Sequence, residues 1–261
     1  MSGLADRLRQ TLRLMLVGLW TTASYLLWLP VAVVVLPFGR WSRRWNEFAI
    51  KLWTRGLVTA MGIQVEVVGI TPHKPFFLVS NHLSYVDILV LGSRLGPTFI
   101  SKQEIAGWPV LGHLARVTGT IFVNRERKRD AVRVLDEIDR AVASGAGVVL
   151  FPEGTSHRGD RVYPLKSALL QGAAERGYPV HAAAVRYATG DPARPAVDSV
   201  CWWGDMTFGP HLLKLLTLPR VRATIAFAQD PVVERERTAL AAGLHAALER
   251  TFTPIPAVEG V

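Results

Sequence analysis

The chain has 261 residues, enough to bury a full hydrophobic core, and 30 Lys and Arg against 21 Asp and Glu give a formal net charge of +9. This charge favours an anionic partner such as a phospholipid, a nucleic acid or a phosphorylated metabolite, and it does not choose among them. The single cysteine, Cys201, excludes an intrachain disulfide and a cysteine-rich metal site. Nothing in the sequence demands an oxidising compartment, so we expect the soluble part to face the cytoplasm.

The stretch from Leu14 to Gly39 carries no charged residue and predicts a membrane-associated segment. It exceeds the roughly 20 residues of one helical span but is too short for two, and Pro30 and Pro37 interrupt its later part. A tilted span and a shallow re-entrant hairpin both fit. Arginines flank both ends, so we expect both flanks on one side of the membrane. A cleaved signal peptide is disfavoured, because its apolar region is usually only about 7–15 residues long.

The next segment, RWSRRWNEFAIKLWTRGLVTAM, places Trp41, Trp45, Phe48 and Trp53 near helical spacing among basic residues. Such a helix suits a lipid headgroup layer. An apolar stripe of this period equally indicates a helix packed on a soluble core, so both interpretations stay open. We expect a membrane-anchoring helical segment over residues 1–61 and a second domain over residues 62–261.

Beyond residue 62, short apolar runs alternate with helical patterns. Strand patterns cover 63–69, 76–80, 98–101, 119–125, 147–154, 180–187, 198–203 and 221–228, and helical patterns cover 86–95, 104–117, 126–144, 166–177 and 234–252. This alternation predicts an α/β fold with a mostly parallel central sheet flanked by helices. In such sheets functional groups gather in the loops just beyond the strand ends.

The stretch SNHLSYVD places His82 five residues before Asp87, where an apolar run ends. A carboxylate bonded to one imidazole nitrogen leaves the other nitrogen free to take a proton from an alcohol. The alternative is a turn and helix cap, with Ser84 as the N-cap and Asp87 in the first turn. The block on its own leaves both interpretations open.

A second polar block, FPEGTSHRGDR, follows the apolar run that ends at Leu150. Gly154, Thr155 and Ser156 can offer backbone N–H groups and hydroxyls to a phosphate. Glu153 is better suited to a substrate hydroxyl or to a nearby arginine. An ordinary turn is the alternative.

A third block, GTIFVNRERKR, brings Arg125 to the end of a strand pattern, where a guanidinium suits a phosphate, and we expect residues 127–129 to form a solvated face. The sequence has no G-x-S-x-G, H-E-x-x-H, G-x-x-x-x-G-K-[ST] or G-x-G-x-x-G pattern. An attacking hydroxyl would therefore come from a substrate or from water. A His–Asp pair that activates a substrate alcohol indicates a group-transfer reaction.

The three blocks in this order resemble the 1-acylglycerol-3-phosphate acyltransferases, within the lysophospholipid acyltransferase superfamily. NHLSYVD is similar to the H-x4-D block of that family, GTIFVNR to its second block and FPEGTS to its third, and SKQEIAGWPVLGHLARVTG looks like the segment between the first two. The resemblance covers roughly Ile63 to Tyr187. The resemblance is weaker at YPVHAAAVRY, where Ala182 stands near a position at which the family has a second proline. The residues that form the wall of the acyl pocket are therefore not assigned.

The resemblance implies that His82 is the general base and Asp87 its orienting carboxylate, with direct attack of the acceptor oxygen on an acyl thioester. It implies phosphate binding by Arg125 and binding of the glycerol phosphate by Glu153 and Gly154, with Thr155 and Ser156 in the same loop. Lys102 is a further candidate for the phosphate. Neither a metal nor another cofactor is implied, because acyl-CoA or acyl carrier protein is the donor.

The expected reaction is acyl transfer to the 2-hydroxyl of 1-acylglycerol 3-phosphate, giving phosphatidate, at the inner membrane with the active site on its cytoplasmic face. We expect no nucleic-acid partner. Alternatives are acylation of another lyso-lipid such as a lyso-ornithine lipid, a non-catalytic basic lipid-binding protein, and a thioesterase or lipase. The segment CWWGDMTFGPHLLKLL is a candidate wall of an acyl tunnel, although aromatic clusters are more often core packing.

Overall fold

The computed structural model describes residues 3–35, 37–124 and 130–256 and contains a seven-stranded sheet of order β1-β7-β6-β2-β5-β3-β4. The strands are β1 (Ile63–Val68), β2 (Phe76–Ser80), β3 (Thr98–Lys102), β4 (Ile121–Val123), β5 (Gly147–Leu150), β6 (Val180–Ala188) and β7 (Val221–Phe227). Only the β6–β7 pairing is antiparallel within this described sheet, and the other five are parallel. The predicted mostly parallel α/β fold is therefore confirmed.

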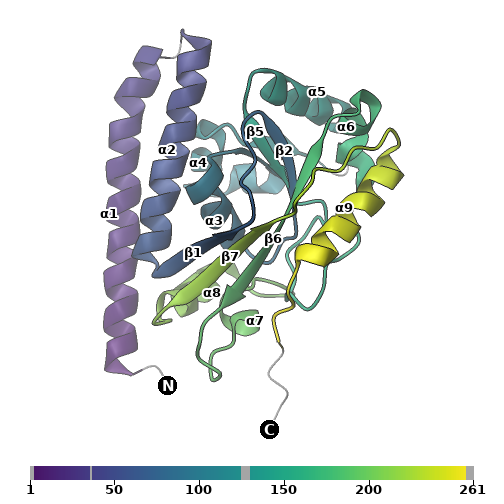
Figure 1. Cartoon of the computed structure of the whole chain (residues 1–261). Coiled ribbons are helices and arrows are strands. Elements are labelled where there is room, and N and C mark those ends of the chain that lie inside the picture. Colours follow the sequence, from purple (N-terminus) through teal and green to yellow (C-terminus); the bar gives the residue numbers. More distant parts are fainter. Residues whose placement is uncertain (1–2, 36, 125–129, 257–261) are drawn as a thin grey trace.

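Helices cover both faces of this sheet (Figure 1). They are α1 (Leu4–Val35), α2 (Gly39–Ala60), α3 (Val86–Leu95), α4 (Leu111–Val117), α5 (Asp130–Ala143), α6 (Gln171–Arg176), α7 (Ala196–Ser199), α8 (Phe208–Leu216) and α9 (Arg237–Thr251), with 3-10 turns η1 (Gln103–Gly107) and η2 (Ser167–Leu170). One buried core lies between the sheet and the side of α2, α3, α7 and α8, and a second lies between the sheet and α5, α6 and α9.

The central strands β2 and β5 are buried along their whole length. Their sequences FFLVS and GVVL are continuous apolar runs because helices cover both of their faces. Since β6, β2, β5, β3 and β4 run parallel, their carboxyl ends meet at one edge of the sheet. The polar sequence blocks that follow β2, β4 and β5 therefore leave the sheet at the same edge.

The N-terminal segment is a helical hairpin of α1 and α2 (Figure 1). Helix α1 runs without a break through Pro30 to Val35, and α2 begins at Gly39, the last residue of the apolar stretch. It is long and apolar enough to cross a membrane, as judged by length and composition alone. The indole N–H of Trp20 donates to the carbonyl of Trp53 over 2.9 Å, and that of Trp28 to the Asn46 side chain over 2.9 Å.

Helix α2 also packs on α3 and β1, and it buries Ile50, Leu57 and Val58 on that side. Of the two interpretations left open for this segment, packing on the soluble core is confirmed for its inner face, and contact with a lipid headgroup layer stays a prediction. Trp41 and Phe48 remain exposed on its other face. The boundary between residues 61 and 62 falls between α2 and β1.

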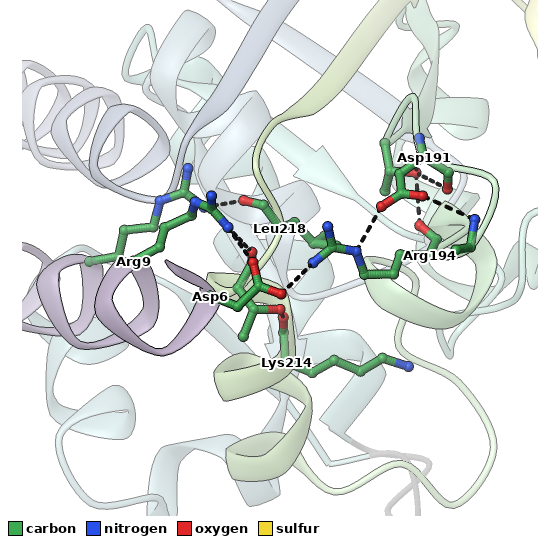
Figure 2. Close-up of polar contacts among 10 residues, drawn as sticks. Asp6, Arg9, Asp191, Arg194, Lys214 and Leu218 are labelled. Atoms are coloured by element: carbon green, nitrogen blue, oxygen red, sulfur yellow. Dashed lines mark hydrogen bonds and ion pairs between the residues drawn. The ribbon is translucent and has the colours of Figure 1, made fainter. Parts of the chain in front are cut away.

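The N-terminal end of α1 is fastened to the domain that follows it (Figure 2). Arg9 donates to the carbonyl of Thr217 over 2.7 Å and to Asp6 over 2.6 Å. Asp6 also pairs with Arg194 at 3.2 Å, and Arg194 pairs with Asp191 at 2.8 Å. The first turns of α1 are therefore held against the rest of the molecule.

Two sequence predictions of secondary structure are wrong. Residues 198–203 are not a strand: α7 ends at Ser199, and the chain then crosses the turn after β2, where Trp202 N–H donates to Leu83 O over 2.8 Å. Residues 104–117 do not form one helix, because η1 and α4 are separated by a turn at Pro109. Helix α8, within CWWGDMTFGPHLLKLL, was not expected.

Candidate active site

The stretch SNHLSYVD is the turn between β2 and α3, and the side chain of Asn81 fixes its start. The Asn81 amide donates to the carbonyl of Val185 over 3.0 Å, and its oxygen accepts from the Val185 N–H over 2.7 Å. The side chain thus continues the pairing of β2 with β6 one step beyond the strand. His82 and Asp87 follow on a turn that is anchored to the sheet.

His82 Nδ1 lies 2.7 Å from Asp87 Oδ2. The carboxylate can only accept, so Nδ1 carries the proton and Nε2 presents its lone pair. Within the described part of the chain, Nε2 has no hydrogen-bond partner. The ring stacks on Phe151 with centroids 4.3 Å apart, and 19% of the side chain is exposed. The nitrogen opposite Asp87 is therefore free to accept a proton.

Asp87 is fully buried and receives four hydrogen bonds. Its Oδ2 also accepts the backbone N–H groups of Leu83 at 2.7 Å and Ser84 at 3.0 Å, and Oδ1 accepts the hydroxyl of Tyr187 at 2.6 Å. These donors satisfy both oxygens of the carboxylate in its buried position. The prediction that Ser84 is the N-cap is wrong, because Tyr85 takes that position and the Ser84 hydroxyl has no hydrogen-bond partner within the described residues.

Tyr187 was missed by the sequence analysis. It lies on β6 and is fully buried. Burial, and secondarily the charge of Asp87, raises the pKa of its hydroxyl well above the usual value, so the group stays a donor. The polar Arg186 between Val185 and Tyr187 indicates that Tyr187 faces inward, but one sequence does not reveal that the hydroxyl meets Asp87, 100 residues away.

Glu153 joins the turn that carries His82 to the loop after β5. Its Oε2 accepts the backbone N–H of His82 over 2.7 Å, and its Oε1 accepts that of Tyr163 over 2.9 Å. Burial, with a smaller contribution from Asp87, raises its pKa to about 7, although both backbone bonds act in the opposite direction. Each oxygen of the Glu153 carboxyl group thus accepts one backbone N–H. Its role in substrate binding stays a prediction.

The residues after Glu153 form a tight loop against the same turn. Gly154 has φ +87, a left-handed conformation that favours glycine, and Thr155 is exposed. The hydroxyl of Ser156 donates to the carbonyl of Trp202. That bond occupies the Ser156 proton, so the Ser156 hydroxyl does not donate to a phosphate while the bond is made. Binding of phosphate by this loop stays a prediction.

Two predicted phosphate ligands remain, Lys102 and Arg125. Lys102 is the last residue of β3 and is exposed. Arg125 lies outside the described residues, two positions after the end of β4. No cluster of three or more His, Cys, Asp or Glu side chains that could hold a metal ion occurs in the described ranges.

Aromatic side chains surround Tyr85, which ends the turn. Its ring makes edge contacts with Trp202 at 5.8 Å and with Phe208 at 4.9 Å, and its hydroxyl lies 3.1 Å from His211 Nδ1. The ring of Trp108 meets Phe208 at 5.8 Å. The segment after Cys201 is thus packed around the turn, and a role as an acyl tunnel stays a prediction.

An α/β sheet with a carboxylate-oriented histidine at its carboxyl edge is an arrangement that suits an acyl-transfer enzyme, and the comparisons with known proteins identify this class. Residues 63–186 match the family model described as Acyltransferase. A lyso-ornithine lipid O-acyltransferase of Rhizobium meliloti is 33% identical over 83% of this chain and 77% of its own length. A 1-acyl-sn-glycerol-3-phosphate acyltransferase of Neisseria meningitidis is 35% identical over 75% of this chain and 76% of its own length.

The chain therefore belongs to the acyltransferase family that includes these lysophospholipid and lyso-ornithine lipid enzymes, and it is an O-acyltransferase. The solved structure of the 1-acyl-sn-glycerophosphate acyltransferase PlsC from Thermotoga maritima has the same fold. Its TM-score is 0.64 with 18% identity, over 93% of this chain and 95% of that one.

Proposed function

We propose that the protein transfers a fatty acyl chain from a thioester, acyl-CoA or acyl carrier protein, to the 2-hydroxyl of 1-acylglycerol 3-phosphate. The observation that carries the proposal is the pair of His82 and Asp87 at 2.7 Å, with Nε2 of His82 free. Membership in the acyltransferase family supports it.

In the proposed mechanism, His82 Nε2 takes the proton of the acceptor hydroxyl as its oxygen attacks the thioester carbonyl. The buried Asp87 carboxylate stabilises the imidazolium that forms. The C–S bond then breaks, the thiol leaves and the proton on His82 returns to it. Arg125 and Lys102 are proposed to bind the acceptor phosphate. The stack of His82 on Phe151 orients the base.

A lyso-ornithine lipid is the second candidate acceptor. Relatives with that name in Rhizobium meliloti, Rhodobacter capsulatus and Brucella abortus align over 83%, 88% and 88% of this chain. The two Neisseria relatives named for 1-acyl-sn-glycerol-3-phosphate align over 75% and 71%. The proton transfer is the same for both acceptors, because each presents an alcohol.

We propose that α1 and α2 hold the enzyme at the inner membrane, with the site on the cytoplasmic face. The exposed face of α1 supports this: Leu8, Leu12, Leu16 and Leu19 are among its exposed apolar residues. A product with two acyl chains resides in the bilayer, so an enzyme anchored at that surface meets both its acceptor and its product.

The test is release of free thiol by detergent-solubilised protein, with acyl-CoA or acyl carrier protein as donor and lysophosphatidate, lyso-ornithine lipid or no acceptor. General-base catalysis is worth about 10²–10⁴-fold, so His82→Ala should lower the acceptor-dependent rate by that factor. His245→Ala, in α9, is the matched control and should keep the wild-type rate. Release without any acceptor would indicate a thioesterase instead, and activity retained by His82→Ala would overturn the mechanism.

A further inference from the structure

His211 is a buried histidine on α8, in the segment CWWGDMTFGPHLLKLL, and only 5% of it is exposed. Its Nε2 lies 3.0 Å from the carbonyl oxygen of Cys201, and its Nδ1 lies 3.1 Å from the hydroxyl of Tyr85. A carbonyl oxygen can only accept, so Nε2 carries the proton and Nδ1 accepts the Tyr85 hydroxyl. Both nitrogens of the buried ring are therefore satisfied, and the direction of each hydrogen bond is defined.

Burial keeps both partners in the protonation states that this arrangement needs. It lowers the pKa of His211, against the opposing effect of the bond to Cys201, and the charge of Lys214 adds to the lowering. Burial also raises the pKa of the Tyr85 hydroxyl. At neutral pH the imidazole is thus neutral and the phenol keeps its proton, so Tyr85 donates to His211.

Tyr85 is the N-cap residue of α3, the helix that carries Asp87 in its first turn. Within the described part of the chain, its side chain makes no capping hydrogen bond to α3, and its hydroxyl bonds to α8 instead. Asp87 Oδ2 in turn lies 2.7 Å from Nδ1 of His82. The position at which α3 begins therefore determines where this carboxylate stands relative to His82.

Helix α8 is a firm support for this bond. Near its C-terminal end the carbonyl of Leu213 accepts from the side chain of Gln10 over 2.8 Å, and the carbonyl of Thr217 accepts from Arg9 over 2.7 Å. Both donors lie on α1. The helix also packs in the core that it shares with α3. Because α8 is held by α1 and by the core, a bond from Tyr85 to α8 restrains the start of α3.

We propose that His211 is a positioning residue for acyl transfer, which holds the start of α3 through the Tyr85 hydroxyl and so fixes the carboxylate that orients His82. The inference rests on the proposed function, since it takes His82 as the base. His211 acts through Tyr85 and Asp87 and not on the substrate. Loss of its bond to Tyr85 should therefore lower kcat and leave KM nearly unchanged.

Two substitutions separate the two hydrogen bonds of the His211 ring. In His211→Asn the side-chain oxygen can stand near the position of Nδ1 and accept the Tyr85 hydroxyl. In His211→Gln the side-chain NH₂ can stand near the position of Nε2 and donate to Cys201, and the Tyr85 bond is lost. Acceptor-dependent thiol release should show kcat lowered about tenfold in His211→Gln and in Tyr85→Phe, and by less than about threefold in His211→Asn.

The variant that combines Tyr85→Phe with His211→Gln should be no slower than either single variant, because both changes remove the same bond. Tyr25→Phe is the matched control, since it removes a bond of the same kind, from Tyr25 to His113 at 2.9 Å, between α1 and α4. It should keep the wild-type kcat. Equal kcat values in His211→Asn and His211→Gln, or a wild-type kcat in Tyr85→Phe, would overturn the assignment.

Hydrogen exchange of the turn tests the positioning without turnover. The N–H groups of Leu83 and Ser84 donate to Asp87 over 2.7 and 3.0 Å, so they should exchange faster in His211→Gln and Tyr85→Phe than in Tyr25→Phe and wild type. Unchanged exchange in the first two variants would remove His211 from this role. If the wild type releases no thiol with any acceptor but the turn loosens as expected, the proposed function fails and the support of the turn by His211 stands.

Discussion

The hydroxyl of Tyr187 and the imidazole of His82 bind opposite oxygens of the Asp87 carboxylate, at 2.6 and 2.7 Å. The Tyr187 hydroxyl is the donor to Oδ1 and holds the carboxylate in the orientation that meets His82, so Tyr187→Phe should loosen the position of the base. We expect kcat to fall by up to about tenfold with KM nearly unchanged, as measured by steady-state kinetics.

Tyr178→Phe is the control for this prediction, because Tyr178 packs in the other core, against α9 and its neighbours. A purely structural role for Tyr187 would lower the melting temperature and leave the kcat of the folded protein unchanged. That result would remove Tyr187 from the set of positioning residues.

Short-range patterns in the sequence predict the parallel sheet and the edge of the sheet at which the candidate site lies. They also predict the pair of His82 and Asp87. Apolar runs followed by polar blocks predict strand ends, and parallel strands bring those ends together. Tyr187 and the contact of Trp202 with Leu83 could not be predicted, because they join segments that are about 100 residues or more apart. The β-type composition of residues 198–203 was overridden by this packing across the turn.

Glu153 makes stability depend on pH. Its pKa in the folded protein is raised to about 7 from a usual value of 4.5, so the folded state holds this proton more tightly than the unfolded state. This group therefore contributes about 3 kcal/mol to the free energy of unfolding below pH 4.5, and the contribution is lost as pH rises through about 7. Urea unfolding of wild type between pH 5 and 8 should show this decline.

Glu153→Gln should flatten that decline, because the amide does not titrate. It should also be less stable by about 1–3 kcal/mol at the acid end, since its NH₂ cannot accept the second backbone N–H. Glu249→Gln, on the exposed side of α9, is the control and should keep the wild-type slope. An unchanged slope in Glu153→Gln would show that another group carries the pH dependence.

Gly159 links the C-terminal tail to the active-site turn, and its replacement by Ala should destabilise the fold. Its φ is +84, its carbonyl accepts the Ile255 N–H over 2.8 Å, and an added Cβ would lie 2.8 Å from Ile255 Cδ1 and 3.4 Å from Leu83 Cδ2. Backbone strain contributes about 1–2 kcal/mol, and displacement of the buried Ile255 adds to it. Thermal and urea unfolding measure the sum.

Gly190→Ala separates the two contributions. Gly190 has φ +69 and nothing within 4 Å of an added Cβ, so only the backbone strain applies. The Gly159 variant should therefore be the less stable of the two and should also lose activity, because Leu83 adjoins His82. Equal stability losses would mean that the Ile255 side chain moves aside at no cost.

The contacts of the α1 N-terminus predict the topology of the protein at the membrane. Asp6 and Arg9 bind groups of the domain that also carries the C-terminus, including Arg194 and the carbonyl of Thr217 (Figure 2). A crossing α1 would have to break these contacts and move Arg9 to the opposite side of the bilayer, so α1 should lie along the bilayer surface with its apolar face in the lipid.

In sealed vesicles, protease should remove N-terminal and C-terminal tags from the same side. Protection of one tag while the other is cleaved would show that α1 spans the bilayer. The variant carrying Arg9→Ala and Arg194→Ala lacks these contacts. Unchanged accessibility of both tags in this variant would show that the apolar face alone holds α1 at the surface.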